Sequence, residues 1–368
     1  MQAHCRKKRM TLHIFNPEHD LALASGLENF TAPHAGRQLR HDLGWLPALW
    51  ASGDDCIVVD DVEFARRKLA LRRKFVKRDK ESLTGWDHTL ATRAFSHISV
   101  WGWDAALKAR LVRAGIDVQL LPTDEALEAI RQLSHRRTSA SLLKTLLEQT
   151  GTERLTGEAC ECTSAEEVTE RIGRWHRVAL KAPWSSSGRG VRFIEGTLSS
   201  SAEGWLRNVL QRQGSVMVEP LYNKVKDFGM EFTSDGRGTI GYEGLSLFHT
   251  ANGAYTGNLL ATEARKRSIL EAYVPGSVLD EVRQAVCRHL AATVGQQYAG
   301  PFGIDMMIVG GSEPCMLHPC VEINLRRTMG HAALALTRLV NPSDDDEVER
   351  VMRIVYESHQ YKLRIERL

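Results

Sequence analysis

The chain lacks long hydrophobic runs and lacks an excess of charge of one sign. No apolar stretch approaches the roughly 18 residues needed to cross a bilayer, and the N-terminus has no apolar signal segment. Its 48 basic and 45 acidic side chains leave a formal net charge of +3, so no global field draws it to nucleic acid or to an anionic membrane. We therefore expect a cytoplasmic protein whose partners include neither a membrane nor a nucleic acid.

A disulfide framework is also missing. The seven cysteines are odd in number and lack the spacing of a small disulfide-bonded scaffold, which favours reduced thiols. Two groups could still be considered for zinc, which needs convergent ligands. They are Cys160 with Cys162, and Cys315 with His318 and Cys320. The sequence leaves the role of the second group open.

The length and composition fit a globular protein of two or three domains. The 368 residues are 43% hydrophobic and 25% charged, with no internal repeat or low-complexity tract. Residues 1–10 are expected to be a disordered tail, because the basic run 6–9 precedes the first orderly strand. The basic segment 66–80 is most simply the solvated face of a helix, and an RNA or acidic partner is the alternative for it.

Strands alternate with helices in residues 11–134, which predicts a parallel αβ sheet as the first domain. Strands are expected at 11–15, 56–59, 98–101 and 116–121, and helices at 62–80 and 103–114. A central lobe, 135–219, and a C-terminal lobe, 220–368, follow. There we expect helices at 138–149, 202–211 and 278–294, strands at 178–181, 191–194, 215–219, 227–233 and 239–248, and a hairpin at 302–325.

A flexible loop of sequence SSSGRG, residues 185–190, separates two strands of the central lobe. Glycine and serine let backbone N–H groups approach an anion closely, although a simple hairpin turn would have the same composition. Lys181 ends the strand before the loop, where its ammonium group can reach a nucleotide phosphate. The loop and the lysine together therefore favour a phosphate site.

The next strand, 216–220, is apolar and ends in an acid and a proline. Its backbone can offer hydrogen bonds to the edge of a purine, and Asp227 can accept hydrogen bonds from ribose hydroxyls. The structural alternatives are that Glu219 caps a turn and that Asp227 is a solvated strand residue.

The strongest pattern lies in the hairpin 302–325. Alternate residues of a strand share a face, so Glu322, Asn324 and Arg326 project together. If the hairpin turns near 313–314, Asp305 lies opposite Glu322, and like charges in that position destabilise a strand pair. A cation removes the conflict, and carboxylate and amide oxygens suit Mg²⁺. A solvent-facing polar stripe is the alternative.

In order and spacing, these motifs resemble the ATP-grasp superfamily over residues 135–330. The resemblance implies an ATP-grasp fold of mixed α/β and α+β class, with an N-terminal Rossmann-like pre-ATP-grasp αβ domain. It assigns nucleotide binding to Lys181, Ser185, Ser186, Ser187, Gly188, Arg189, Gly190, Val218, Glu219 and Asp227. It assigns metal binding to Asp305, Glu322 and Asn324, and catalysis to Arg326 and Lys181.

Two other segments are candidates for substrate binding. One follows the first strand and the other contains glycines and hydrogen-bonding side chains. Their candidate residues are Asn16, Glu18, His19 and Asp20, and His249, Tyr255 and Asn258. A turn with a helix capped by Asp20 explains the first equally well, and a surface hairpin explains the second.

The chain departs from the family at the start of its central lobe. The family usually has a phosphate-binding lysine there, whereas this chain offers Arg136 and Arg137, whose planar guanidinium groups demand different geometry. The sequence does not decide which of the two arginines takes the place of that lysine.

The resemblance implies a ligase that uses ATP and Mg²⁺, with Mn²⁺ as a substitute. Such an enzyme activates a small-molecule carboxylate as an acyl phosphate and couples it to an amine or a similar nucleophile. A small-molecule kinase and a non-catalytic ATP-binding regulatory protein are the alternatives. The identities of carboxylate and nucleophile do not carry over, and a homodimer stays open.

Overall fold

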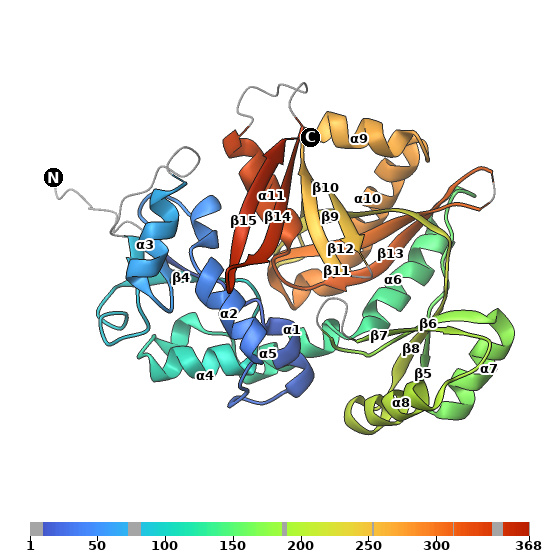
Figure 1. Ribbon diagram of the computed structural model, residues 1–368, viewed down its shortest axis with the longest axis horizontal. Coiled ribbons are helices and arrows are strands. Elements are labelled where there is room, and N and C mark those ends of the chain that lie inside the picture. Colours follow the sequence, from blue (N-terminus) through green and yellow to red (C-terminus); the bar gives the residue numbers. More distant parts are fainter. Residues whose placement is uncertain are drawn as a thin grey trace.

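The computed structural model describes residues 10–72, 82–185, 190–251, 254–311, 313–340 and 349–367. Three β-sheets organise the chain, and Figure 1 shows them side by side with helices packed against each. No helix in the described ranges combines the length and the apolar composition of a membrane span.

The first sheet is parallel, as the alternation of strands and helices predicts, with strand order β3-β2-β1-β4. Its strands are β1 (Met10–Ile14), β2 (Cys56–Val58), β3 (Leu83–Thr84) and β4 (Phe95–Val100). The helices of this part are α1 (His19–Ser25), α2 (His34–Leu43), α3 (Val62–Ala70), α4 (Ala105–Arg113) and α5 (Asp124–Leu133).

Two predictions in this region need correction. The strand expected at 116–121 is wrong, because Val118–Leu120 forms a short 3₁₀ helix in which the Asp117 side chain accepts a hydrogen bond from the backbone N–H of Gln119. Apolar residues flank this helix and are buried, so they resemble a strand in sequence. The helix expected at 62–80 ends at Ala70, and residues 73–81 lie outside the described ranges.

The second sheet is antiparallel, with strand order β5-β8-β6-β7. It consists of β5 (Cys160–Cys162), β6 (Arg177–Lys181), β7 (Val191–Glu195) and β8 (Val216–Pro220). Helices α7 (Ala165–Trp175) and α8 (Ser200–Gln213) share a hydrophobic core with alternate residues of these strands, such as Val178 and Leu180. The odd-numbered residues Ala179 and Lys181 alternate with these and therefore face away from both helices.

The third sheet has seven strands in the order β13-β12-β9-β10-β11-β14-β15. They are β9 (Lys224–Asp235), β10 (Ile240–Ala251), β11 (Ala254–Leu260), β12 (Ala299–Val309), β13 (Met316–Asn324), β14 (Arg350–Glu357) and β15 (Gln360–Arg367). Helices α6 (Arg136–Gln149), α9 (Glu263–Glu271), α10 (Gly276–Ala292) and α11 (Met329–Val340) accompany it. The sequence analysis did not predict β14 and β15.

One face of the third sheet is covered by the hydrophobic core, so only the side chains on its other face are available to form a binding site. Phe228, Met230 and Ile304 are buried in one hydrophobic cluster with leucines of α6 and valines of α10. Because side chains alternate along a strand, the odd-numbered residues of β9 and β12 point to the opposite face. That face carries the polar residues described next.

Candidate functional site

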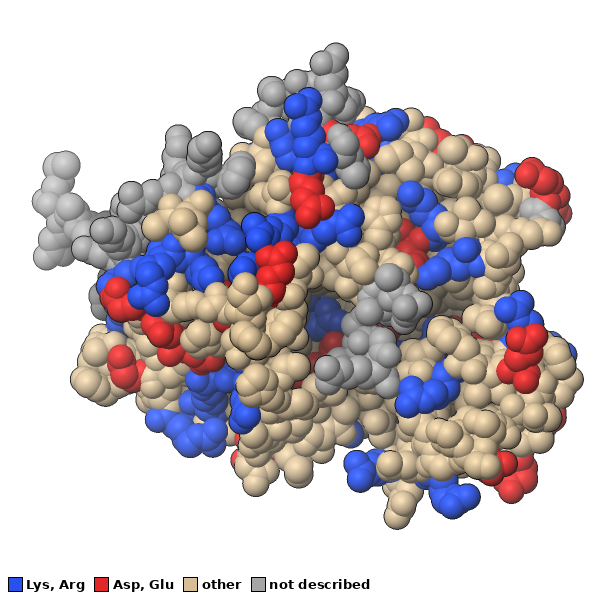
Figure 2. Space-filling view, viewed as in Figure 1, with Lys and Arg blue, Asp and Glu red and all other residues tan. Residues whose placement is uncertain are grey.

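A cavity of about 670 Å³ opens between the second and third sheets. Figure 2 shows a hollow near the centre of this face of the molecule, with acidic and basic side chains visible inside it. Ten of the residues proposed from the sequence line the cavity. They are Lys181, Ser185, Glu219, Asp227, Tyr255, Asn258, Asp305, Glu322, Asn324 and Arg326.

The acidic side of the cavity lies on the hairpin β12–β13. Asp305 pairs directly with Glu322, which confirms the predicted register. The Asn324 amide donates a hydrogen bond to Asp305 Oδ2 at 3.1 Å. Burial, followed by the charges of Glu322 and Glu231, raises the pKa of Asp305 to about 8. The two strands thus hold adjacent carboxylates that need a counter-charge.

Arg136 supplies one counter-charge to these acids. Its Nη2 lies 2.7 Å from Glu322 Oε1, and its Nη1 donates to Ser185 Oγ at 2.9 Å and to the carbonyl oxygen of Ala182. Arg137 instead points to Glu161 and does not line the cavity. Of the two arginines left open by the sequence, Arg136 is therefore the one that reaches the cavity.

Lys181 enters the cavity from the end of β6. Its Nζ lies 2.5 Å from Glu219 Oε2, and both side chains are buried, so each charge offsets the other.

Val218 is fully buried on the helix-covered face and does not line the cavity, which leaves only its backbone for a ligand. Tyr222, just beyond β8, joins the lining, and burial raises the pKa of its hydroxyl to about 12.

Asp227 lies farther along the same wall, at the start of β9. Its Oδ2 accepts hydrogen bonds from Lys224 Nζ at 2.5 Å and from Thr250 Oγ1 at 2.8 Å. The side chain is therefore partnered on one side while it still borders the cavity.

The loop expected to bind phosphate is described only at its two ends. Ser185 lines the cavity, and the Gly190 carbonyl accepts a hydrogen bond from the Ala182 N–H at 2.8 Å. A Cβ on Gly190 would lie 2.2 Å from Ser185 Cβ, so this close approach of the two ends requires glycine. Ser186, Ser187, Gly188 and Arg189 lie outside the described residues.

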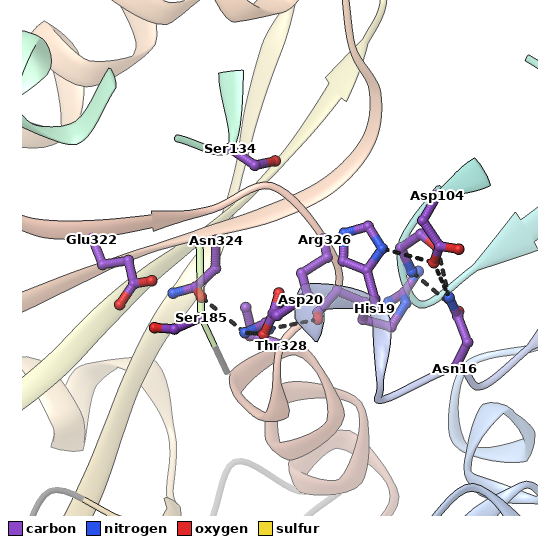
Figure 3. Close-up of polar contacts among 12 residues, drawn as sticks. Asn16, His19, Asp20, Asp104, Ser134, Ser185, Glu322, Asn324, Arg326 and Thr328 are labelled. Carbon is purple, nitrogen blue, oxygen red and sulfur yellow. Dashed lines mark hydrogen bonds and ion pairs between the residues drawn. The ribbon is translucent and has the colours of Figure 1, made fainter. Parts of the chain in front are cut away.

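The segment after β1 contributes to the site through Asp20. Figure 3 shows its carboxylate facing Arg326, whose Nε and Nη2 donate to the two carboxylate oxygens at 2.7 and 2.9 Å. Burial acts to raise the pKa of Asp20, but the charge and hydrogen bonds of Arg326 outweigh it and hold that pKa below its usual value. Capping of α1 by Asp20 is wrong, because Asp20 lies inside the first turn and Glu18 occupies the capping position.

The other candidates in this segment are engaged within the N-terminal domain. Asn16 Nδ2 donates to the carbonyl oxygen of Gly102 at 2.8 Å. Figure 3 shows that the side chains of Asn16 and His19 both contact the Asp104 carboxylate, with His19 Nδ1 3.2 Å from Asp104 Oδ2. Glu18 forms an ion pair with Arg40. None of these three side chains lines the main cavity.

The second candidate segment forms the hairpin β10–β11. Tyr255 and Asn258 line the cavity, and the Tyr255 hydroxyl donates to Asn258 Oδ1. His249 does not line it, and burial lowers the pKa of its imidazole. Residues 252–253 at the tip lie outside the described ranges.

The sequence analysis missed several cavity residues. Glu231, Ser246, Thr328 and Gly330 all line the cavity. The alternation of β9 could have identified Glu231, because Glu231 shares a face of the strand with Asp227. Gly229 lies midway between them on the same face. The other three residues have no comparable signal in the sequence, because serine, threonine and glycine are common on any polar strand or turn.

The structure gives no support to a zinc site. In the described part of the chain, no three or more His, Cys, Asp or Glu side chains converge to hold a metal ion, and the described cysteines are free thiols. His318 is buried without a hydrogen-bond partner at either ring nitrogen, and burial, then the charge of Lys181, lowers its pKa to about 3. Burial likewise raises the pKa of the Cys320 thiol.

Comparison with solved structures identifies the fold. No protein-family model and no curated protein sequence matches the chain. N5-carboxyaminoimidazole synthetase from Staphylococcus aureus, complexed with ADP, aligns with a TM-score of 0.51 at 12% identity, over 96% of this chain and 84% of that one. This likeness confirms the predicted ATP-grasp fold with its N-terminal αβ domain.

Two further structures align less closely. Biotin carboxylase from Campylobacter jejuni gives a TM-score of 0.48 at 11% identity, over 96% of this chain and 78% of that one. L-amino acid ligase from Bacillus licheniformis gives 0.47 at 12% identity, over 95% and 81%.

Proposed function

We propose that the protein is an ATP-dependent ligase that activates a small-molecule carboxylate as an acyl phosphate and couples it to an amine, releasing ADP and phosphate. The observation that carries the proposal is the single cavity shared by Lys181 on one sheet and by the acids of β12 and β13 on another. The protein of similar fold from S. aureus was crystallised with ADP, which supports a nucleotide in this cavity.

The acidic side of the cavity fits a magnesium ion. Asp305 and Glu322 lie directly opposite each other, and burial followed by the charges of Glu322 and Glu231 raises the pKa of Asp305. Together with Asn324 they offer the hard oxygen ligands that Mg²⁺ or Mn²⁺ accepts. A bound metal ion would supply charge neutralisation for the phosphate oxygens of ATP.

The protein's own residues would then bind and orient the substrates. Lys181 and Arg136 place positive charge where the nucleotide phosphates enter, and Arg326 extends this charge toward the third sheet. A carboxylate oxygen of the substrate attacks the γ-phosphorus, forms the new P–O bond and displaces ADP. The neutral amine nitrogen then attacks the acyl carbon, forms the C–N bond and displaces phosphate, and the proton that the nitrogen loses leaves with the phosphate. Positioning by these side chains would supply most of the rate acceleration.

The reaction calls for a direct test. Amino acids and other small acids, combined with amines, should release ADP and phosphate in a carboxylate-dependent manner, and the product mass should correspond to an amide. A phosphorylated compound that survives turnover would favour a kinase instead. Nucleotide binding without any ADP formation across the screen would favour a regulatory protein.

The sequence divisions 11–134, 135–219 and 220–368 remain our proposal for the domains. The first and third share a hydrophobic core through the C-terminal hairpin. The free thiols of the described residues are consistent with a reducing compartment, and we place the reaction in the cytoplasm.

Lys181→Met should weaken the binding of MgADP by about 10- to 100-fold, because a charge-assisted hydrogen bond to phosphate contributes about 1.5–3 kcal/mol. Isothermal titration calorimetry measures this directly. Lys144→Met is the matched control, since Lys144 is an exposed lysine on α6 outside the cavity. Equal affinities for the Lys181 and Lys144 variants would contradict the assignment of Lys181 to the nucleotide.

A further inference from the structure

Glu231 occupies a niche in the wall of the cavity that glycines make possible. It projects from β9, is 3% exposed, and lines the cavity. A Cβ on Gly330 would lie 1.8 Å from Glu231 Oε1, and a Cβ on Gly303 would lie 2.5 Å from Oε2. Any larger residue at either position would therefore occupy the space of the carboxylate.

The two oxygens of this carboxylate have different surroundings. Oε2 accepts a hydrogen bond from Thr328 Oγ1 at 2.8 Å and lies 3.0 Å from His331 Nδ1. Oε1 accepts no hydrogen bond from any residue in the described ranges. Glu231 lines the cavity, so Oε1 is open to a donor from a molecule that binds there.

Hydrogen-bonding groups near Oε1 form the rest of this niche. The Cβ that a larger residue would place at position 330 would also lie 2.5 Å from Ser246 Oγ. The Ser246 hydroxyl and Glu231 Oε1 are therefore close neighbours. Asn258 Nδ2 donates to Ser246 Oγ at 2.8 Å, and its Oδ1 is already engaged by Tyr255. The Ser246 O–H is thus left to donate, and the niche combines a negative oxygen with one hydroxyl.

The charge around the niche favours a cation over a neutral ligand. A Cβ on Gly229 would lie 3.6 Å from both Glu231 Oε1 and Asp305 Oδ1, so a second carboxylate lies on the same wall. Of the cations nearby, Arg326 is engaged by Asp20. Lys266 and Arg327 also interact electrostatically with Glu231, and the ammonium group of Lys266 donates to the carbonyl oxygen of Leu245. The niche offers one carboxylate oxygen and one hydroxyl, which suit a cation with directional N–H donors.

We infer that Glu231, with Ser246 beside it, forms the subsite for the ammonium group of the amine substrate and accepts one proton from it, so that the neutral nitrogen can attack the acyl carbon. The inference rests on the proposed ligase function and adds to it the place where the amine binds. The niche lies on the same wall as Asp305 and Asn324, where the acyl phosphate would form. Thr328 and Gly330 shape the niche from the start of α11.

Calorimetric titration of the MgADP-loaded protein at pH 7 tests the subsite. The probes are ethylamine, 1,4-diaminobutane and the amides of glycine, alanine and lysine, each beside the analogue with hydroxyl in place of the amino group. At least one amine should bind saturably and at least about 10-fold more tightly than its hydroxyl analogue, as expected for a hydrogen bond to a charged group.

Three variants separate the subsite from a general effect on the fold. Glu231→Gln should weaken that amine about 10- to 100-fold and remove its preference over the hydroxyl analogue. Gly330→Ala should weaken binding because the added Cβ would displace the Glu231 carboxylate without removing its charge. Glu243→Gln removes an exposed carboxylate of the neighbouring strand β10 and should change nothing. Thermal unfolding of each variant checks that it is folded.

The outcomes distinguish this inference from the proposed function. Normal MgADP binding with no amine of the panel binding to the wild type, or with unchanged amine affinity in Glu231→Gln, would overturn the amine subsite alone. Failure of MgADP to bind would contradict the proposed function. The amine titration is then carried out on nucleotide-free protein, where the same comparison between wild type and Glu231→Gln decides the subsite.

Discussion

Asp305→Asn is expected to lower turnover by at least about 1,000-fold while making the metal-free protein more stable. The loss of activity follows because the variant removes one of the two opposed carboxylates proposed to bind the metal ion. The gain in stability follows because the same change relieves the repulsion between Asp305 and Glu322. A residue needed only for folding would not show this combination of opposite effects.

The stability gain should depend on pH. Burial and the neighbouring acids raise the pKa of Asp305 from 3.8 to about 8, so the folded state holds a proton that the unfolded state releases. Stability from this group is complete below about pH 4 and is lost as pH rises through 8. In EDTA, the free energy of unfolding of the wild type should therefore be close to that of Asp305→Asn at pH 4 and a few kcal/mol below it at pH 8. Added Mg²⁺ should narrow the gap.

Glu170→Gln provides the control, because Glu170 is an exposed carboxylate on α7. It should leave both the activity and the pH profile unchanged. If Asp305→Asn melts below the wild type at pH 8 without metal, Asp305 is held by favourable contacts and the paired-acid argument fails.

Arg326→Ala is expected to lower turnover by about 1,000-fold and to destabilise the protein by about 3 kcal/mol. The second effect arises because Asp20 would be left as a partly buried carboxylate without its bidentate partner. Asp20→Asn in the Arg326→Ala background should restore part of that stability without restoring activity. Asp20→Asn alone should lower turnover less than Arg326→Ala does, because the guanidinium remains but loses its orientation.

A double-mutant cycle over these two positions measures the coupling. We expect chemical denaturation to give a coupling energy of about 1–3 kcal/mol, since the two side chains are in direct contact. Additive effects on stability would show that the ion pair contributes nothing to the fold. A turnover in Asp20→Asn equal to the wild type would show that Asp20 does not orient Arg326.

The sequence was sufficient for features that depend on neighbouring residues. The alternation of side chains along a strand placed Asp305, Glu322 and Asn324 on one face, and the hairpin turn then fixed the pairing of the two acids. The position of Lys181 at the end of a strand before a flexible loop likewise led to its prediction as a phosphate-binding residue, and the structure places it in the cavity. These are short-range consequences of strand geometry and turn position.

Contacts between distant segments could not be predicted in this way. Asp20 and Arg326 are 306 positions apart, and Arg136 and Glu322 are 186 apart. Such pairs depend on how the sheets dock, which no local pattern encodes. The prediction for 116–121 failed for the opposite reason, because a local hydrogen bond from the Gln119 N–H to the Asp117 carboxylate accompanies a 3₁₀ turn within an apolar run.

The C-terminal hairpin, β14 and β15, packs against the N-terminal domain. Met352 and Leu363 of β14 and β15 are packed with Trp45 and Leu46 of the N-terminal domain and with Leu336 of α11. The first domain and the hairpin β14–β15 therefore share one hydrophobic core. Until residues 350–367 have folded against it, the first domain cannot reach its final packing.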